Sequence, residues 1–268
     1  MPAIVYSKQD PAGSLVAKML RETRKFDEIH GDLPTWIDVG TDAQLIEVEG
    51  RLLDAEDLHV ESDYVIFASR HRSKSAKPAF TVHVSGNWGK AEMGGSPGEL
   101  AYAQPSAMKH AFMELNKLGY SGFEVSMEAT HHGPTSLLSR LFFIELGSSE
   151  AQWADKEAAK ALAGVIVRTV ECERERQFEK VAVGIGGGHY CPDFAKIELT
   201  TDIAFAYVMT NHDIAEAGDD VFSQAVQKSG AELVVIDWKG LKSAQRQKAI
   251  GLAEGAGLKW VKDDEVKV

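Results

Sequence analysis

The sequence predicts an α/β fold, a three-layer sandwich in which helices cover both faces of a mixed, mostly parallel central sheet. Apolar runs of strand length alternate with amphipathic helical segments from one end of the chain to the other, which is typical of βαβ units. The chain has 268 residues, of which 44% are hydrophobic, so it can bury one large core. We therefore expect a single domain over residues 1–268.

The first strand and helix have clear boundaries. Residues 3–6 form an apolar run, and Asp10 is a good N-cap residue before Pro11, which suits the first helical position. An amphipathic helix is therefore expected over residues 11–25. Further helices are expected at residues 105–119 and 149–172, and strands at residues 35–38, 45–48, 64–68, 80–84, 123–129, 181–185, 204–208 and 233–236.

Composition restricts the classes of function. The formal net charge of −11 argues against indiscriminate nucleic-acid binding, which depends on many lysines and arginines that neutralise phosphates. A nucleic-acid partner would have to meet local basic patches. No apolar run approaches the roughly 18 residues that cross a bilayer, and the N-terminus lacks the basic and apolar regions of a signal peptide. We expect a cytoplasmic protein.

The chain has two cysteines, Cys172 and Cys191, which form no CxxC motif. A disulfide framework or a cysteine-rich zinc site is therefore not supported. Any metal would have to be held by His, Asp or Glu. Cys191 has a neighbouring histidine, but nothing in the sequence places it in the electropositive surroundings that a reactive thiolate needs.

Glu128 lies on the polar face of the strand predicted at 123–129, and His131 and His132 lie in the loop that follows it, in the segment Glu-Ala-Thr-His-His-Gly-Pro-Thr. Burying a carboxylate without a partner is costly, so Glu128 should meet a histidine, an arginine or a metal. Gly133 and Pro134 force the chain out of strand geometry, which lets both imidazoles line one cavity. The alternative is an edge strand with a wet polar face and a histidine pair without a catalytic role.

His189 follows three consecutive glycines, 186–188, after another predicted strand. The run does not fit the GxGxxG dinucleotide fingerprint, whose third glycine would fall on His189. Glycines do allow backbone N–H groups to approach a phosphate or the oxyanion of a tetrahedral intermediate. The alternative is that a tight turn under a crossing helix requires them.

His83 lies on the predicted strand 80–84 and would approach the His131–His132 loop if the strands at 80–84 and 123–129 are neighbours. A core histidine with satisfied hydrogen bonds is the alternative. Asn87 and Trp88 follow it and could contact a base or side chain, although a buried tryptophan that anchors a loop would look the same.

A basic run, residues 70–77, follows the strand predicted at 64–68. It holds four Lys or Arg residues without an acid, and at a strand's C-terminal end it could bind phosphates beside an active site. The alternative is a solvated loop.

Together, residues 128–135, 186–192 (Gly-Gly-Gly-His-Tyr-Cys-Pro) and 81–88 (Thr-Val-His-Val-Ser-Gly-Asn-Trp) resemble the archaeal-type D-aminoacyl-tRNA deacylases, a family also found in plants. The resemblance covers nearly the whole chain. It implies hydrolysis of the ester between a D-amino acid and tRNA, a zinc cofactor, and a fold related to the phosphorylase/peptidyl-tRNA-hydrolase-like α/β proteins. D-aminoacyl-tRNA is then the partner, and we expect a monomer without an obligate protein partner or a membrane contact.

If the chain is such a deacylase, residues from all the segments above contribute to its site. The expected catalytic residues are Glu128, His131, His132 and His189; the expected zinc ligands are His83, His131, His132 and His189; the expected substrate-binding residues are Arg70, Arg72, Lys74, Asn87, Trp88, Thr135, Gly186, Gly187 and Gly188. The sequence alone does not divide the ligand and general-base roles among the histidines. The alternatives are another metallo-hydrolase or nucleoside phosphorylase on the same scaffold, and a non-catalytic tRNA-binding protein.

Overall fold

The computed structural model describes residues 1–173, 178 and 180–266. Over this part of the chain the α/β class with a mixed, mostly parallel sheet is confirmed, although helices and strands do not alternate throughout, because β2 to β6 follow one another without an intervening α-helix. The helices are α1 (Pro11–Thr23), α2 (Pro105–Leu118), α3 (Glu150–Trp153), α4 (Lys156–Glu173), α5 (Pro192–Thr200), α6 (Asp219–Ser229) and α7 (Ser243–Gly255). The strands are β1 (Ala3–Ser7), β2 (Phe26–Ile29), β3 (Thr35–Asp38), β4 (Gln44–Val48), β5 (Val65–Arg72), β6 (Ala79–His83), β7 (Glu124–Met127), β8 (Leu141–Ser148), β9 (Lys180–Ile185), β10 (Ile203–Met209), β11 (Leu233–Ile236) and β12 (Lys259–Lys262).

The strands form two sheets. The larger has the order β2-β3-β4-β1-β5-β8-β6-β7, with parallel pairs β4-β1, β1-β5, β5-β8 and β6-β7. The pairs β2-β3, β3-β4 and β8-β6 are antiparallel, so the direction changes toward both ends of the sheet. The smaller sheet, β10-β9-β11-β12, is entirely parallel.

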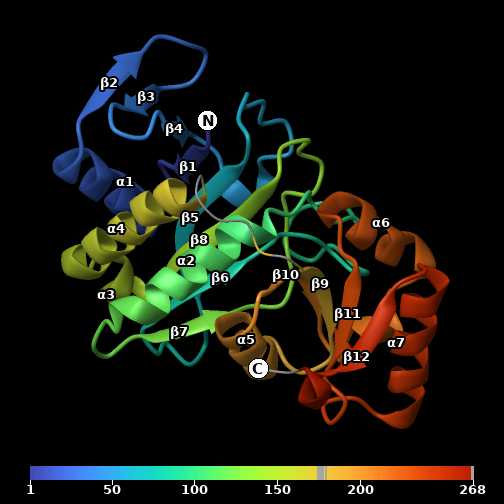
Figure 1. Ribbon diagram of the computed structural model, residues 1–268. Coiled ribbons are helices and arrows are strands. Elements are labelled where there is room, and N and C mark those ends of the chain that lie inside the picture. Colours follow the sequence, from blue (N-terminus) through green and yellow to red (C-terminus); the bar gives the residue numbers. More distant parts are fainter. Residues whose placement is uncertain (174–177, 179, 267–268) are drawn as a thin grey trace.

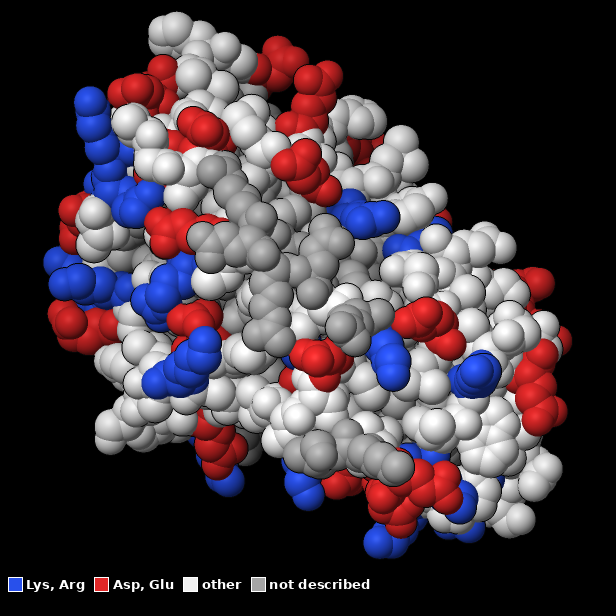
Figure 2. Space-filling model, viewed as in Figure 1, with Lys and Arg blue, Asp and Glu red and all other residues white. Residues whose placement is uncertain are grey.

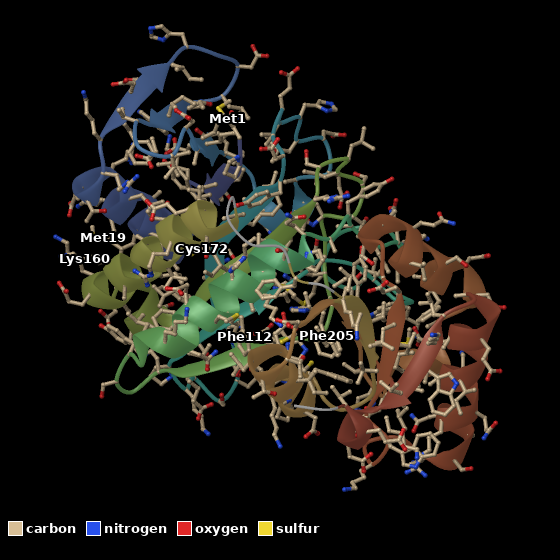
Figure 3. The ribbon with its side chains drawn as sticks, in the orientation of Figure 1. Met1, Met19, Phe112, Lys160, Cys172 and Phe205 are labelled. Atoms are coloured by element: carbon tan, nitrogen blue, oxygen red, sulfur yellow. The ribbon has the colours of Figure 1, made fainter. Side chains whose placement is uncertain are left out.

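Helices α1, α2 and α4 lie on one face of the larger sheet, and α6 and α7 flank the smaller one (Figure 1). Phe112 of α2 and Phe205 of β10 are both fully buried where these two elements meet (Figure 3). The chain after β7 also crosses to the smaller sheet, because the Thr130 amide donates to the Val208 carbonyl at 2.9 Å. The interpretation of the chain as one domain stays a prediction.

Local signals explain the helix ends. The Asp10 side chain accepts a hydrogen bond from the Gly13 amide at 2.9 Å and Pro11 opens α1, as predicted. Helix α2 begins at Pro105 and is followed by Gly119 in the left-handed conformation, with φ of 55°.

Three strands, β2, β8 and β12, were not predicted, although β8 lies inside the larger sheet, and two predicted boundaries are wrong. The helix predicted over residues 149–172 is interrupted between α3 and α4, where Asp155 Oδ1 accepts from the amides of Glu157 and Ala158. Strand β5 extends to Arg72, because β8 is long enough to pair with all of it. The start of the basic run therefore lies on a strand.

Positive and negative side chains are interspersed on the face shown in Figure 2, among the residues that are coloured there. Among the residues that the structure describes, no helix is both long and apolar enough to cross a membrane.

Helix α1 packs on β5 through a glycine. A Cβ atom at Gly13 would clash with the Ala68 carbonyl oxygen, whereas one at Gly251 in α7 would meet no atom within 4 Å. We predict that Gly13→Ala lowers the free energy of unfolding by about 1–3 kcal/mol through overpacking, and that Gly251→Ala raises it by up to about 1 kcal/mol through helix propensity. Urea titration of both variants measures this, and equal effects would contradict close packing of α1.

Candidate active site

A row of polar side chains crosses one face of the larger sheet. Cross-strand pairing aligns Ser69 of β5 with Glu145 of β8, and Glu145 with Thr81 of β6. Both hydroxyl groups donate to the Glu145 carboxylate, Ser69 at 2.7 Å and Thr81 at 3.3 Å. Because alternate residues share a face, His71 and His83, two positions further along β5 and β6, lie on this same face.

Glu145 lies between two buried histidines. His71 Nδ1 lies 3.4 Å from one carboxylate oxygen, and His83 Nε2 lies 3.7 Å from the other. Burial alone would raise the pKa of Glu145, but the contacts with His71 and His83 hold it below its usual range. This carboxylate is therefore ionised at neutral pH.

Glu128, one residue beyond β7, is the second centre of charge. Its Oε1 lies 2.8 Å from His71 Nδ1, and its Oε2 lies 3.1 Å from His189 Nε2 and 3.5 Å from His131 Nε2. Its side chain is 1% exposed. Burial disfavours the ionised form, but His189 and His71 hold the pKa of Glu128 well below its usual range. Strand β7 is an edge strand, yet Glu128 is buried because the smaller sheet covers it.

His71 lies between the two carboxylates. Burial opposes its charge, but the contacts with Glu128 and Glu145 outweigh burial and raise the pKa of His71 to about 11. Its Nε2 lies 3.3 Å from the Tyr190 hydroxyl, which also donates to Ser73 Oγ at 3.1 Å. The imidazolium thus links the two acids of the larger sheet to the glycine-rich loop of the smaller one.

Three imidazoles gather beside these acids, because β6 and β7 are neighbours, the condition under which His83 was expected to approach the loop. The ring centroids of His83, His131 and His132 are 4.4–4.8 Å apart. His131 Nδ1 lies 2.7 Å from the Ala129 carbonyl oxygen, and His132 Nδ1 contacts the Gly133 carbonyl oxygen. A carbonyl only accepts hydrogen bonds, so both Nδ1 atoms carry the hydrogen and both Nε2 atoms have a lone pair.

These histidines differ in charge from His71. Burial and the neighbouring His83 lower the pKa of His132 to about 4, and the same two causes, with His132, lower the pKa of His131 well below its usual range. Both are therefore neutral at pH 7. Burial also opposes a charge on His83, but Glu145 raises the pKa of that ring.

The backbone of the histidine loop is firmly held. His132 has φ of 51°, which is uncommon for a residue other than glycine and is found mainly where the surroundings impose it. Glu56 accepts hydrogen bonds from the amides of Thr135 and Ser136 at 2.8–3.0 Å. Gly133 touches the backbone of Gly95 and Leu53 so closely that a Cβ atom would not fit. The imidazoles are thus on a rigid support.

A cavity of about 590 Å³ opens over the cluster. Its lining includes Glu128, His131, His132 and His189, and at its rim the exposed Arg51, Arg70 and Arg72. Lys74 is exposed further along the same segment. Arg70 lies 3.9 Å from Asp10.

The other residues expected to bind substrate already have partners in the fold. The Asn87 amide donates to the carbonyls of Gly94 and Ser96, and Trp88 is 3% exposed with its indole N–H donating to Val208. The Thr135 hydroxyl accepts from the Ser96 amide. These contacts favour the alternative of loop anchors, and a role in binding substrate stays a prediction.

The glycines before His189 lie against Asp237. A Cβ atom at Gly186 or Gly187 would approach the Asp237 side chain at 3.0–3.1 Å, and both glycines have positive φ. Close packing therefore requires glycine at these two positions. Gly188 is exposed, and a Cβ atom there would meet no atom within 4 Å. An oxyanion-binding role for the run stays a prediction.

Cys191 is buried and N-caps α5, and burial raises the pKa of its thiol. The thiol is therefore protonated at neutral pH, which agrees with the expectation that it is not a nucleophile.

Sequence reasoning missed two residues of the cluster. Glu145 is a single acid inside the apolar run of β8, and a buried acid needs a partner; recognising the strand would have revealed it. His71 was hidden in the basic run, although the burial of β5 at positions 70–72 alternates exposed, buried and exposed.

The fold and the cluster define a class of protein, an α/β protein with a histidine–carboxylate centre suited to proton transfer or metal binding. The D-aminoacyl-tRNA deacylase family model matches residues 58–261, and the chain belongs to that family.

Curated relatives and a solved structure agree. The chain is 42% identical over 208 residues to a D-aminoacyl-tRNA deacylase of Thermococcus kodakarensis, covering 76% of this chain and 75% of the relative. It is 33% identical over 276 residues to the D-aminoacyl-tRNA deacylase of Archaeoglobus fulgidus, covering 100% and 98%. The solved structure of AF0625, a conserved protein of unknown function, is 34% identical and has a TM-score of 0.91, covering 100% of this chain and 96% of that one.

The pKa of His71 gives a test of the cluster. The pKa of His71 is near 11 in the folded protein and about 6.5 in the unfolded chain. The protonated ring therefore contributes its full stabilisation below pH 6.5, and this contribution is lost as pH rises toward 11. We predict that the difference in unfolding free energy between wild type and His71→Asn shrinks by about 1.4 kcal/mol per pH unit above pH 7.

Chemical denaturation at several pH values measures this difference, and NMR of the His71 ring should show it protonated at pH 9. A ring that loses its proton near pH 6.5 would contradict the ion pairs with Glu128 and Glu145.

Proposed function

We propose that this chain hydrolyses the ester bond between a D-amino acid and tRNA, with Glu128 and the histidines around it as the active site. The observation that carries the proposal is the ionised, buried Glu128 between His189 and His131, at the floor of an arginine-rimmed cavity, in a chain of the deacylase family. Family relatives are named for this activity.

The contact between Glu128 and His189 supports a general-base role for His189. An ionised carboxylate only accepts, so Nε2 of His189 carries the hydrogen and Nδ1 has the lone pair. The side chain is 44% exposed at the cavity, and among the described residues Nδ1 has no hydrogen-bond partner. His189 can therefore take a proton from a water that attacks the ester carbonyl.

The reaction then balances without a further reactant. The water oxygen bonds to the carbonyl carbon, the carbon–oxygen bond to the terminal ribose breaks, and the proton held by His189 passes to the leaving ribose oxygen. Glu128 keeps the imidazole oriented and stabilises its charged form. The products are the free D-amino acid and tRNA.

The donor set beside this base fits the zinc ion that the family resemblance implies. His131 and His132 each donate Nδ1–H to a carbonyl, the usual arrangement of a metal-bound histidine, and offer a neutral Nε2. Among the described residues, His83 is fully buried and neither of its nitrogens has a hydrogen-bond partner. Nitrogens of His83, His131 and His132 lie within 4.8 Å of one another. These residues would hold the ion, which when bound supplies a Lewis acid for the ester carbonyl.

The exposed arginines at the cavity rim support tRNA as the substrate. Arg70 and Arg72 flank His71 on β5 and line the same cavity as the cluster, so phosphates on its rim would lie next to the catalytic cluster. Lys74 extends this positive segment beyond the strand.

Matched D- and L-aminoacyl-tRNAs test the function directly. We predict that His189→Ala lowers the deacylation rate at least about 100-fold, the typical contribution of a general acid–base group, and that His131→Ala lowers it by a similar factor because it removes a proposed ligand of the ion. His59→Ala, at an exposed position away from the cluster, should keep the wild-type rate. Thermal melting confirms that the variants are folded. Near-normal turnover in both active-site variants would refute the assignment.

Metal dependence is a separate prediction. Dialysis against a strong chelator should abolish turnover and added zinc should restore it, because neutral imidazoles are the groups that can bind the ion. Zinc content measured by mass spectrometry should fall in His83→Ala and His132→Ala but not in His59→Ala. Full activity of zinc-free protein would show that the histidines act without a metal.

A further inference from the structure

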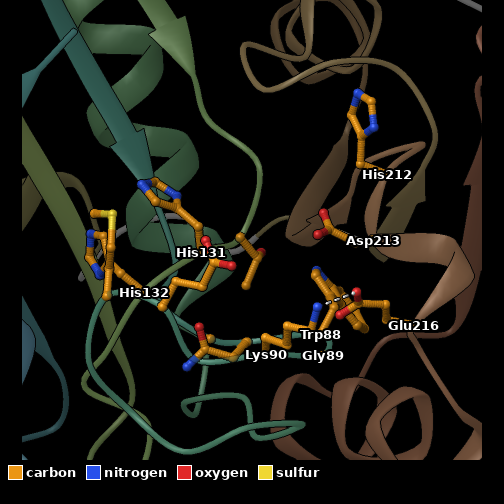
Figure 4. A pocket seen from close by; sticks show the side chains of 13 residues that line it. Trp88, Gly89, Lys90, His131, His132, His212, Asp213 and Glu216 are labelled. Carbon is orange, nitrogen blue, oxygen red and sulfur yellow. Dashed lines mark ion pairs between the residues drawn. The ribbon is translucent and has the colours of Figure 1, made fainter.

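A second cavity lies on the other side of the histidine pair. It has a volume of about 310 Å³ and is lined by residues 86–90, 92, 93, 130–132, 212, 213 and 216. His131, His132 and Met93 line both this cavity and the larger one. Figure 4 shows His131 and His132 at one side of the second cavity and His212, Asp213 and Glu216 at the other.

The two cavities differ in charge. The larger one is lined by three acids, Asp10, Glu128 and Glu145, but these are offset by Arg51, Arg70 and Arg72 and by His71, which forms ion pairs with Glu128 and Glu145. The wall of the smaller one contains three acids, Glu92, Asp213 and Glu216, against one lysine, Lys90, which is 3.5 Å from Glu216. Asp213 is held in place because its Oδ2 accepts from the amide and hydroxyl of Thr210 at 3.1 and 2.6 Å. The smaller cavity therefore favours a cation.

The 3′ end of an aminoacyl-tRNA has the matching polarity. Phosphates lie on the ribose side of the ester, and the α-ammonium group lies on the amino-acid side. We propose that the smaller cavity binds the aminoacyl group with its ammonium at Asp213 and Glu216, while the larger cavity binds the terminal nucleotide. The inference rests on the proposed deacylase function and assigns a subsite within it.

This arrangement also gives a physical basis for selecting the D enantiomer. In this arrangement the ester carbonyl lies at the histidines, the ribose in the larger cavity and the ammonium at the acids. The two remaining substituents on the α-carbon are hydrogen and the side chain. These two exchange places between enantiomers, so the ammonium contact makes the cavity wall distinguish them. Loss of the contact lets the aminoacyl group rotate and weakens the discrimination.

The test compares substrates with and without the ammonium group. For the double variant Asp213→Asn/Glu216→Gln, kcat/KM on D-aminoacyl-tRNA should fall about 10- to 100-fold, the typical loss when a hydrogen bond to a charged group is removed. The preference for D over L should fall with it. On N-acetyl-D-aminoacyl-tRNA, which has no ammonium group, wild type and variant should be equally slow. Glu254→Gln, the same charge change at an exposed position on α7, should match wild type on every substrate.

Three outcomes would overturn the assignment. An equal loss on the free and acetylated substrates would show that the acids serve the fold or the chemistry. A loss no greater than that of Glu254→Gln would show that they do not bind substrate. If neither the wild-type protein nor His189→Ala hydrolyses D-aminoacyl-tRNA, the deacylase function itself is refuted, and the proposed subsite with it.

Discussion

Burial of two carboxylates under a set of imidazoles is the constraint that organises this molecule. Glu128 and Glu145 are both nearly inaccessible, and an isolated buried charge costs several kcal/mol. His71 is the cation that contacts both acids, with its pKa raised to about 11 by them. The neutral His131 and His132 then lie beside two carboxylates whose charge is compensated by His71. One imidazole that is charged at neutral pH thus allows its neighbours to act as bases or ligands.

Residues from both sheets are needed to form this histidine–carboxylate centre. The larger sheet contributes the row through Ser69, Glu145 and Thr81, and the smaller sheet contributes the loop with His189 and Tyr190. The Ala129 amide donates to the His189 carbonyl at 2.7 Å, so the acid-bearing segment and the glycine-rich loop are joined directly through their backbones. Movement of one sheet relative to the other would separate Glu128 from His189.

The same boundary gives the candidate active site two unlike sides. The histidine loop, held by Glu56 and by backbone packing at Gly133, stands between an arginine-rimmed cavity and an acid-lined one. An ester with a polyanion on one side and a cation on the other matches this arrangement. Charge complementarity of this kind fixes the orientation of a ligand more than its affinity, which is what an enzyme that distinguishes enantiomers needs.

The sequence by itself determined the fold class, the ends of α1 and α2, and the two histidine loops. Capping residues, apolar periodicity and the rare run of imidazoles, glycine and proline are local signals, and the three motifs together indicated the family. His83, Glu128, His131, His132 and His189 were predicted, and tertiary structure brings them together. Only tertiary structure decided that β8 lies between β5 and β6, because strand order depends on packing across the whole sheet. That order adds Glu145 and His71 to the centre and sets the charge of each ring, since a histidine's pKa depends on neighbours that are distant in sequence.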